Sequence, residues 1–219
     1  MIRVLLADDD PLVRTGLRLL LRGAGDIEVV GEAANGAEVG DAARRHSPDV
    51  VLMDLRMPVL DGLAATRALA RGGADAPPVI VLTTFDEPGL VVSAMRAGAA
   101  GYLLKHAEPA EIVAAVRLAA RGEPALSPAA ARALMAHAAA GGGDGRAERA
   151  RRRLALLSDR ERAVAEAVAE SLSNSEIGAR LHLSVGTVKA HLSSALTKLG
   201  LDNRVQLALL AHDARSARS

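Results

Sequence analysis

The sequence predicts a doubly wound parallel α/β domain followed by a small all-helical bundle. Residues 1–121 alternate short apolar runs with stretches whose apolar side chains recur at helical spacing. Residues 154–219 show helical spacing, with Ser, Asn and Gly at the expected helix ends. We expect residues 122–153 to form a linker that contains one helix.

Five apolar runs, rich in β-branched residues, predict the strands of the first domain. They are too short for ordinary helices, and stretches with helical periodicity lie between and after them. The runs cover residues 2–7, 27–33, 49–54, 78–84 and 101–105. Five such units predict a parallel sheet with helices on both faces. Ligands of such sheets bind beyond the carboxyl ends of the strands, so we expect the site at that edge.

The predicted linker has three parts. Residues 127–140 are expected to form a helix with Ser127 as its N-cap and Pro128 at its first position. The glycine-rich residues 141–145 interrupt this helix, and the basic residues 146–153 have the composition of a solvated segment. Contact of this basic run with nucleic-acid phosphates is the alternative.

Four helices are expected in residues 154–213, because the signals for their ends are clear. Three of them begin with a capping box or its Asn variant. The pairs are Ser158 with Glu161, Ser173 with Glu176 and Asn203 with Gln206. Ser184 caps the third helix in chain order, and Gly200 ends it. The short turn of residues 182–184 gives the second and third helices the geometry of a helix-turn-helix.

Composition narrows the class of protein. The absence of Cys excludes disulfides, thiol catalysis and Cys-based zinc sites. No apolar run is long enough to span a membrane, and the apolar N-terminal stretch is too short for a signal peptide. We therefore expect a cytoplasmic protein with no membrane partner. Residues 1–121 hold 13 basic and 16 acidic side chains and residues 122–219 hold 14 and 10, which favours two modules with different partners.

Acidic side chains follow two of the predicted strands. Asp8, Asp9 and Asp10 come directly after the first strand, and Asp54 ends the third. Where those strand ends are neighbours, the carboxylates repel one another and raise each other's pKa. A hard divalent cation held by oxygen ligands relieves this repulsion, and Mg²⁺ is the usual choice. Lys105, after the fifth strand, can bring a positive charge to the same edge.

These parts suit the formation of an aspartyl phosphate. That chemistry needs a carboxylate nucleophile, a metal ion, a Lys and a hydroxyl group, which Thr83 and Thr84 offer at the end of the fourth strand. Helix capping is the alternative role for Asp10, because Pro11 suits the first position of a helix. Capping does not account for the whole set, since a Lys and a hydroxyl have no part in it.

Four segments of the first domain carry a recognisable set of motifs. They are LLADDDPLVR, VLMDLRMPVLDG, VIVLTTFDE and GAAGYLLKHAEP. Together they resemble the receiver domain of two-component response regulators, a flavodoxin-like (βα)5 fold, and the resemblance covers residues 1–121. It implies that Asp54 is the phosphoacceptor, with Asp9 as the less suited alternative. The implied Mg²⁺ ligands are Asp8, Asp9, Asp54 and the main-chain carbonyl of Arg56.

The same resemblance assigns a conformational switch. It implies that Thr83 is the hydroxyl that turns toward the phosphoryl group, that Tyr102 is the aromatic residue coupled to it, and that Lys105 pairs with the phosphate. Many receivers have a Pro in a cis bond after this Lys, whereas this chain has His106. A strained or cis Lys105–His106 bond is therefore a hypothesis for the structure to test.

The third bundle helix, over residues 185–199, has two distinct faces. Apolar side chains at core spacing form one of them: Val185, Val188, Leu192, Leu196 and Leu199. The other is small and polar, with one cation and no acid: Gly186, Lys189, Ala190, Ser193 and Thr197. Such a face is slim enough to approach base edges in the major groove. A plain solvated face, the alternative, usually includes Glu or Asp.

Residues 157–200, LSDRERAVAEAVAESLSNSEIGARLHLSVGTVKAHLSSALTKLG, resemble a LuxR-type helix-turn-helix domain, and the match extends to about residue 213. The resemblance implies a helix-turn-helix over residues 174–193. The implied DNA-binding residues are Asn174, Ser184, Thr187, Lys189, Ala190, His191 and Ser193. Of these, Lys189, Ala190 and Ser193 are expected to face the groove. Thr187, His191 and Arg204 are also candidates for contacts with the DNA backbone or for structural roles. Glu161 and Asn174 are expected to support the bundle.

The order receiver, linker, LuxR-type domain resembles that of NarL/FixJ-family response regulators. It implies that a sensor histidine kinase phosphorylates Asp54 and that this phosphorylation controls DNA binding and transcription. It also implies that the chain catalyses no reaction other than its own Mg²⁺-dependent phosphoryl transfer and dephosphorylation. The other implied partners are double-stranded DNA half-sites, a second copy of the chain when active, and RNA polymerase as a candidate. The implied dimer surface is Val205, Leu207, Ala208 and Leu210, with core packing as the alternative.

Two other functions stay open. One is a LuxR-type DNA-binding regulator that works without phosphorylation. The other is an enzyme with an Asp nucleophile for phosphoryl groups, which would need a substrate site for which the short loops leave little room. No glycine-rich nucleotide-binding loop is present in the sequence, which argues against ATP chemistry.

Overall fold

Six parallel strands of the described chain form one sheet in the order β2-β1-β3-β4-β5-β6. They are β1 (Ile2–Ala7), β2 (Ile27–Ala33), β3 (Val50–Met53), β4 (Val79–Thr83), β5 (Gly101–Leu104) and β6 (Ala125–Leu126). The five expected strands are all present. β6 was not expected, because two residues are too few to show a periodicity, and it pairs with β5 through Gly101–Ala125 and Tyr102–Leu126.

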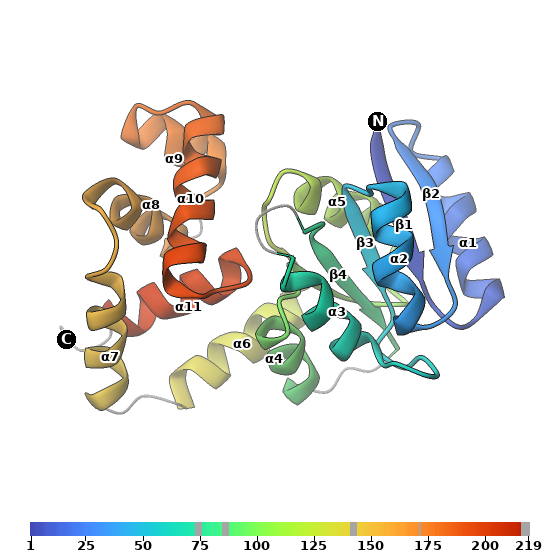
Figure 1. Cartoon of the computed structure of the whole chain (residues 1–219), viewed down its shortest axis with the longest axis horizontal. Coiled ribbons are helices and arrows are strands. Elements are labelled where there is room, and N and C mark those ends of the chain that lie inside the picture. The colour runs from blue at the N-terminus through green and yellow to red at the C-terminus, as the bar shows by residue number, and fades with distance from the viewer. Residues whose placement is uncertain (73–75, 85–87, 141–143, 171, 216–219) are drawn as a thin grey trace. The chain divides into compact units, whose positions relative to one another are not determined.

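The computed structural model describes the chain apart from a few short stretches (Figure 1). The residues left out are 73–75, 85–87, 141–143, 171 and 216–219. The chain divides into two compact units, Met1–Ala131 and Arg132–Ser219.

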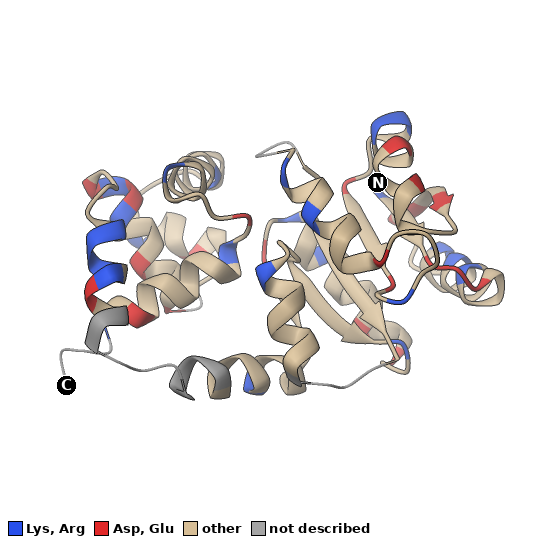
Figure 2. Ribbon diagram, turned by 60° about the horizontal axis from the view of Figure 1, so that its bottom comes forward, with Lys and Arg blue, Asp and Glu red and all other residues tan. Residues whose placement is uncertain are grey.

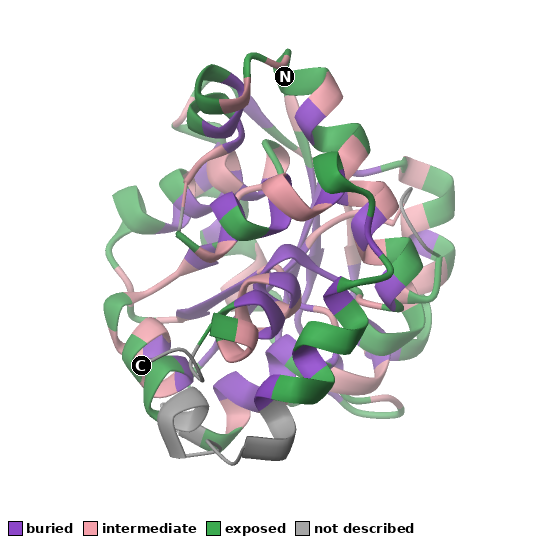
Figure 3. Ribbon diagram, turned by 90° about the vertical axis from the view of Figure 1, so that its left-hand side faces the viewer, coloured by how far each residue is buried: buried purple, intermediate pink, exposed green. Residues whose placement is uncertain are grey.

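Helices cover both faces of the sheet, as a doubly wound fold requires. They are α1 (Pro11–Arg22), α2 (Gly36–His46), α3 (Gly62–Ala70), α4 (Pro88–Arg96) and α5 (Pro109–Ala120). Along β1, Val4 and Leu6 belong to an apolar cluster with side chains of α1 and α5, whereas Leu5 and Ala7 belong to one with side chains of α2 and α3. This alternation buries the strands on both sides (Figure 3).

The residues after the sheet differ in part from the predicted linker. The expected helix is α6 (Pro128–Ala140), and the Ser127 Oγ accepts a hydrogen bond of 3.2 Å from the main-chain N of Ala130. The arginines at 149 and 151–153 are exposed, as expected for a solvated segment, but the segment is helical. This segment lies in a second helix, α7 (Asp144–Leu154), which has Arg151, Arg152 and Arg153 in its last turn (Figure 2).

Helix α7 belongs to the bundle because its apolar side chains enter the bundle core. Ala150 is 2% exposed and Leu154 8% exposed, and both lie in the apolar cluster of the second unit. This role could not be predicted from the sequence, because a few small apolar side chains among many arginines give a weak signal for a buried face.

The four predicted helices of the bundle are present. They are α8 (Asp159–Ala169), α9 (Asn174–Leu181), α10 (Val185–Leu199) and α11 (Arg204–Arg215). The capping boxes at Ser158 and Ser173 are both formed, and Gly200 ends α10 with a φ of 59°. Asn203 accepts a hydrogen bond from the main-chain N of Gln206, and the Gln206 side chain accepts one from the main-chain N of Asp202.

One residue of the predicted core face of α10 is not in the core. Val185 is 45% exposed, whereas Val188 is fully buried. Val185 is the first residue of the helix. The apolar face of α10 therefore packs into the bundle only from Val188 onward.

No helix within the described part of the chain is both long and apolar enough to cross a membrane.

Candidate functional site

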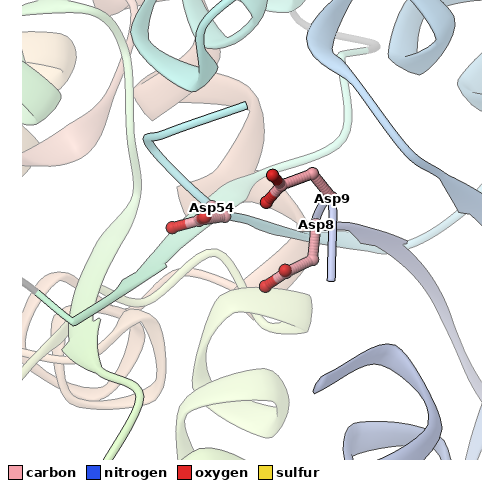
Figure 4. A group of neighbouring side chains, drawn as sticks. All are labelled: Asp8, Asp9 and Asp54. Atoms are coloured by element: carbon pink, nitrogen blue, oxygen red, sulfur yellow. The ribbon is translucent and has the colours of Figure 1, made fainter. Parts of the chain in front are cut away.

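Three carboxylates lie together at the carboxyl edge of the sheet. β1 and β3 are adjacent, and their register pairs Ala7 with Met53, so that Asp8 and Asp54 follow directly at neighbouring strand ends. One carboxylate oxygen each from Asp8, Asp9 and Asp54 lies within 4.8 Å of the other two (Figure 4). Asp8 and Asp54 are buried, at 3% and 6% exposed, whereas Asp9 is exposed.

Lys105 joins this group from the end of β5. Its Nζ lies 2.6 Å from Asp8 Oδ2 and 3.2 Å from Asp54 Oδ2. Its main-chain N donates a hydrogen bond of 2.7 Å to the Thr83 carbonyl, which fixes the residue beside β4. A single ammonium group therefore bridges the two buried carboxylates.

The pKa values of Asp54 and Lys105 are shifted from their ordinary values. Burial raises the pKa of the Asp54 carboxyl, and the nearby Asp8 charge adds to this, while Lys105 opposes it without cancelling it. Burial lowers the pKa of Lys105, but the hydrogen bond to Asp8 and the two carboxylate charges outweigh it, so the net shift is upward. Lys105 therefore stays charged beside its two acidic partners.

The donor set fits a hard divalent cation. All three acidic side chains offer oxygen, and this group includes no His or Cys. Such oxygens suit Mg²⁺, which is held by one or a few carboxylates and keeps several waters. Arg56, whose carbonyl the sequence resemblance adds to this set, lies exposed in the loop after β3.

A helix-turn-helix forms the second site. Helices α9 and α10 are joined at His182, which has a left-handed φ of 55°, and the Ser184 Oγ accepts a hydrogen bond of 3.1 Å from the main-chain N of Thr187. The small polar face of α10 lies at the surface: Gly186, Lys189, Ala190 and Thr197 are exposed and Ser193 is half-buried. His191 is half-buried.

Known proteins resemble both parts of the chain. A family model for the response regulator receiver domain matches residues 4–117, and one for the luxR family of bacterial regulatory proteins matches residues 155–211. The nitrate/nitrite response regulator protein NarL of Escherichia coli K12 is 38% identical over 214 residues, which cover 97% of this chain and 95% of NarL. This chain belongs to the NarL/FixJ family of response regulators.

Further relatives are similar to this response regulator over nearly its whole length. The transcriptional regulatory protein LiaR of Bacillus subtilis strain 168 is 41% identical over 212 residues, which cover 97% of each chain. The crystal structure of the response regulator ChrA of a heme-sensing two-component system is 39% identical, covers 98% of each chain and has a TM-score of 0.53. In this protein, as in its family, phosphorylation of the receiver by a sensor histidine kinase controls DNA binding and transcription.

The predicted switch residues of this response regulator are buried. Thr83 at the end of β4 is fully buried, and Tyr102 in β5 is 1% exposed. Thr84, the other hydroxyl considered for this edge, is exposed. β4 and β5 are adjacent and pair Thr83 with Leu104, which places Thr83 next to the strand that leads to Lys105.

The hypothesis of a cis bond between Lys105 and His106 is wrong. The described chain contains no cis peptide bond. Because a non-proline residue follows Lys105, the trans form is favoured by about 3 kcal/mol, and the receiver fold does not override this preference.

Sequence reasoning missed two residues that shape the acidic edge of this response regulator. Arg14 in α1 donates a hydrogen bond of 2.6 Å to the Asp8 carbonyl and one of 2.9 Å to Glu32 Oε2, which ties the loop after β1 to β2. Gly62 approaches the chain so closely that a Cβ there would lie 1.9 Å from the Asp54 main-chain oxygen. The glycine after Asp61 was visible in the sequence, but its close approach needs the folded loop.

Not every residue implied in DNA binding lies on the surface. Asn174 is 2% exposed, and its Oδ1 accepts a hydrogen bond of 2.6 Å from Arg204 Nη1. Arg204 is 8% exposed and also donates to the Leu172 carbonyl. Ser184 uses its hydroxyl to cap α10. The structure thus gives Asn174 and Arg204 a place inside the bundle, in agreement with the structural roles considered for them.

The implied dimer surface on α11 is mostly part of the monomer core. Leu207 is fully buried and Leu210 is 9% exposed within the apolar cluster of the bundle, and Val205 is 7% exposed. Ala208 is half-buried. Core packing therefore accounts for Leu207 and Leu210, the alternative that the sequence left open.

Proposed function

We propose that Asp54 is the phosphoacceptor of this response regulator and that Mg²⁺ is held by Asp8, Asp9, Asp54 and the main-chain carbonyl of Arg56. The observation that carries this proposal is the bridge of Lys105 between Asp8 and Asp54, at 2.6 and 3.2 Å. It gathers a nucleophile, a metal-binding acidic pair and a phosphate-pairing cation at one strand edge.

In the proposed reaction an Asp54 carboxylate oxygen attacks the phosphorus of a phosphohistidine on the kinase. The new O–P bond forms as the P–N bond breaks, and the electron pair stays on the histidine nitrogen, which takes up a proton. Mg²⁺, when bound, neutralises charge on the transferring phosphoryl oxygens. Lys105 exchanges part of its contact with Asp54 for the phosphoryl group, because its charge is already at that edge.

The phosphorylated state is proposed to pull Thr83 and Lys105 toward the phosphoryl group. Tyr102 then repacks with Thr83 on the α4–β5–α5 side of the receiver. The burial of both Thr83 and Tyr102 supports this, because a buried pair changes its packing in discrete steps. Phosphorylation shifts the two states only by its differential stabilisation of the active one.

The exposed face of α10 is proposed to read base edges, with Lys189, Ala190 and Ser193 in the major groove and Thr187 and His191 near the backbone. Residues 154–219 hold 8 basic and 7 acidic side chains, so one copy has little charge for binding phosphates. Two copies on paired half-sites would compensate. We infer an active homodimer for this reason, and RNA polymerase is a candidate partner of the bound dimer.

The test is intact mass and DNA binding before and after treatment with acetyl phosphate and Mg²⁺. The wild-type chain should gain one phosphoryl group and bind DNA more tightly, and Asp54→Asn should do neither. Asp10→Asn is the matched control, because Asn caps α1 as well as Asp does. A phosphoryl group retained by Asp54→Asn contradicts the assignment of Asp54, and unchanged DNA binding on phosphorylation favours the regulator that works without it.

A further inference from the structure

Three helices of the second unit line an open cavity that the proposed function does not use. It has a volume of about 250 Å³ and is lined by α7, α8 and α11. Its lining includes one arginine from each helix: Arg151, Arg162 and Arg215. Apolar surface comes from Leu154 and Ala211. None of these residues belongs to α10 or to the acidic edge of the receiver.

The lining has an excess of positive charge. Glu166 is the single acidic residue among the lining residues, so three guanidinium groups meet one carboxylate. Arg151 donates its Nε to the Ala214 carbonyl at 3.1 Å, and Arg215 Nη1 lies 3.4 Å from Glu170 Oε1 outside the cavity. The lining residues alone carry a net charge of about two positive units, and Glu170 offsets part of the charge of Arg215. Like charges that converge in this way favour an anion between them.

A buried donor without an acceptor gives a second, independent observation. The Nε of Arg162 is buried and has no hydrogen-bond partner, and its Nη2 reaches the Leu157 carbonyl only at 3.4 Å. Buried donors in proteins are paired in the great majority of cases, and an exception points to a water or an ion. Arg162 also lines the cavity, and its covered Nε would meet an oxygen of a bound ligand once the guanidinium group turns toward that space.

We propose that this cavity binds a phosphate group, either free or on a small phosphomonoester. A phosphate carries a charge of about −1.5 to −2 at neutral pH, which matches the excess of the lining. Its oxygens suit the planar fork of a guanidinium group. The volume, equal to about eight waters of the liquid, leaves room for a short apolar or hydroxylated carbon chain beside Leu154 and Ala211.

Binding here would stabilise the second unit. The ligand would connect α7, α8 and α11 through their arginines, and α7 is otherwise held by small apolar side chains such as Ala150. A ligand that binds only the folded state raises the melting temperature, and the stabilisation grows with the logarithm of the ligand concentration once this exceeds Kd. The site therefore has a thermal readout that does not depend on phosphorylation of Asp54.

The test uses the full chain with Asp54→Asn in EDTA, so that the receiver contributes no phosphate chemistry. Inorganic phosphate and glycerol 3-phosphate are titrated at constant ionic strength, with chloride as the reference ion, and binding is followed by calorimetry and by the melting temperature. We expect saturable binding of at least one of the two, and the tighter one identifies the source of the phosphate group. Arg162→Met should weaken it by about tenfold or more, as expected for a lost charge-assisted hydrogen bond.

Arg160→Met is the matched control, because Arg160 is exposed on the same helix and does not line the cavity. It removes the same charge and should bind as the parent does. If Arg162→Met fails to fold by circular dichroism, Arg151→Met tests the opposite wall. Equal affinities for the Arg162 and Arg160 variants overturn the proposal, as does the absence of saturable binding at millimolar phosphate.

Discussion

Glu161 in α8 and Lys198 in α10 form an ion pair, with 2.8 Å between Oε2 and Nζ. Glu161 is 4% exposed, and its Oε1 accepts a hydrogen bond of 2.7 Å from Ser194 Oγ. The same carboxylate accepts one of 2.8 Å from the main-chain N of Ser158. One acidic side chain therefore joins the start of α8 to two consecutive turns of the helix that is proposed to read DNA.

This arrangement predicts acid sensitivity of the bundle. The hydrogen bonds from Lys198, Ser194 and Ser158 lower the pKa of Glu161 from 4.5 to about 2. Because the folded-state pKa is the lower one, its stabilisation is complete above the unfolded value and is lost as the pH falls from about 4.5 to about 2. The contribution is on the order of 3 kcal/mol. Urea unfolding of the bundle over this pH range should show the loss.

Glu161→Gln should lower the free energy of unfolding at neutral pH. It should also make this free energy depend less on pH in the acidic range. Glu166→Gln is the control, because Glu166 is exposed on the same helix. An acid profile that stays the same in Glu161→Gln would show that other carboxylates cause the transition.

Arg204 should be essential for the bundle rather than for contact with DNA. Its guanidinium bonds to Asn174 Oδ1 and to the Leu172 carbonyl in a nearly buried position. Arg204→Met removes these charge-assisted bonds and should destabilise the bundle by about 3 kcal/mol. The melting temperature measures this, with the exposed Arg160→Met as control. A stable Arg204→Met protein with weakened DNA binding would instead indicate a direct contact with DNA.

Two glycines should respond to alanine with opposite signs. A Cβ at Gly62 would lie 1.9 Å from the Asp54 main-chain oxygen, so Gly62→Ala should displace that loop, cost about 1–3 kcal/mol and slow phosphorylation by acetyl phosphate. A Cβ at Gly16 in α1 meets no atom within 4 Å, and Gly16→Ala should stabilise the receiver by about 0.5–1 kcal/mol. Denaturant unfolding and phosphorylation rates test both, and equal rates in the two variants would contradict the role of Gly62.

Thr83→Ala should separate phosphorylation from its effect on DNA binding. The variant keeps Asp54 and Lys105, so it should still gain phosphoryl mass. It lacks the hydroxyl that would bond to the phosphoryl group, and the increase in DNA affinity should fall by roughly tenfold. Thr84→Ala is the matched control at the neighbouring, exposed position. Full activation of phosphorylated Thr83→Ala would show that Thr83 is not the switch.

Helix α7 shows why part of the second unit could not be predicted. Its sequence is dominated by arginine, and the buried Ala150 gives little hydrophobic periodicity. The burial of such small side chains depends on packing against α11, which lies far along the chain. The cavity with Arg162 depends on the same packing, so no local pattern could have indicated it.

The sequence by itself determined the five strands β1–β5, the helix ends of α8, α9 and α10, and the residue types at the acidic edge. Periodicity and capping depend on neighbours along the chain, so LLADDD and the Ser–Glu capping pairs predict local structure directly. The tertiary structure decided which side chains meet. It placed Lys105 between Asp8 and Asp54, tied Arg14 to the Asp8 carbonyl and buried Asn174 with Arg204. The contacts of Lys105 and of Asn174 join residues far apart in sequence, and their distances follow from strand order and helix packing, which no local pattern contains.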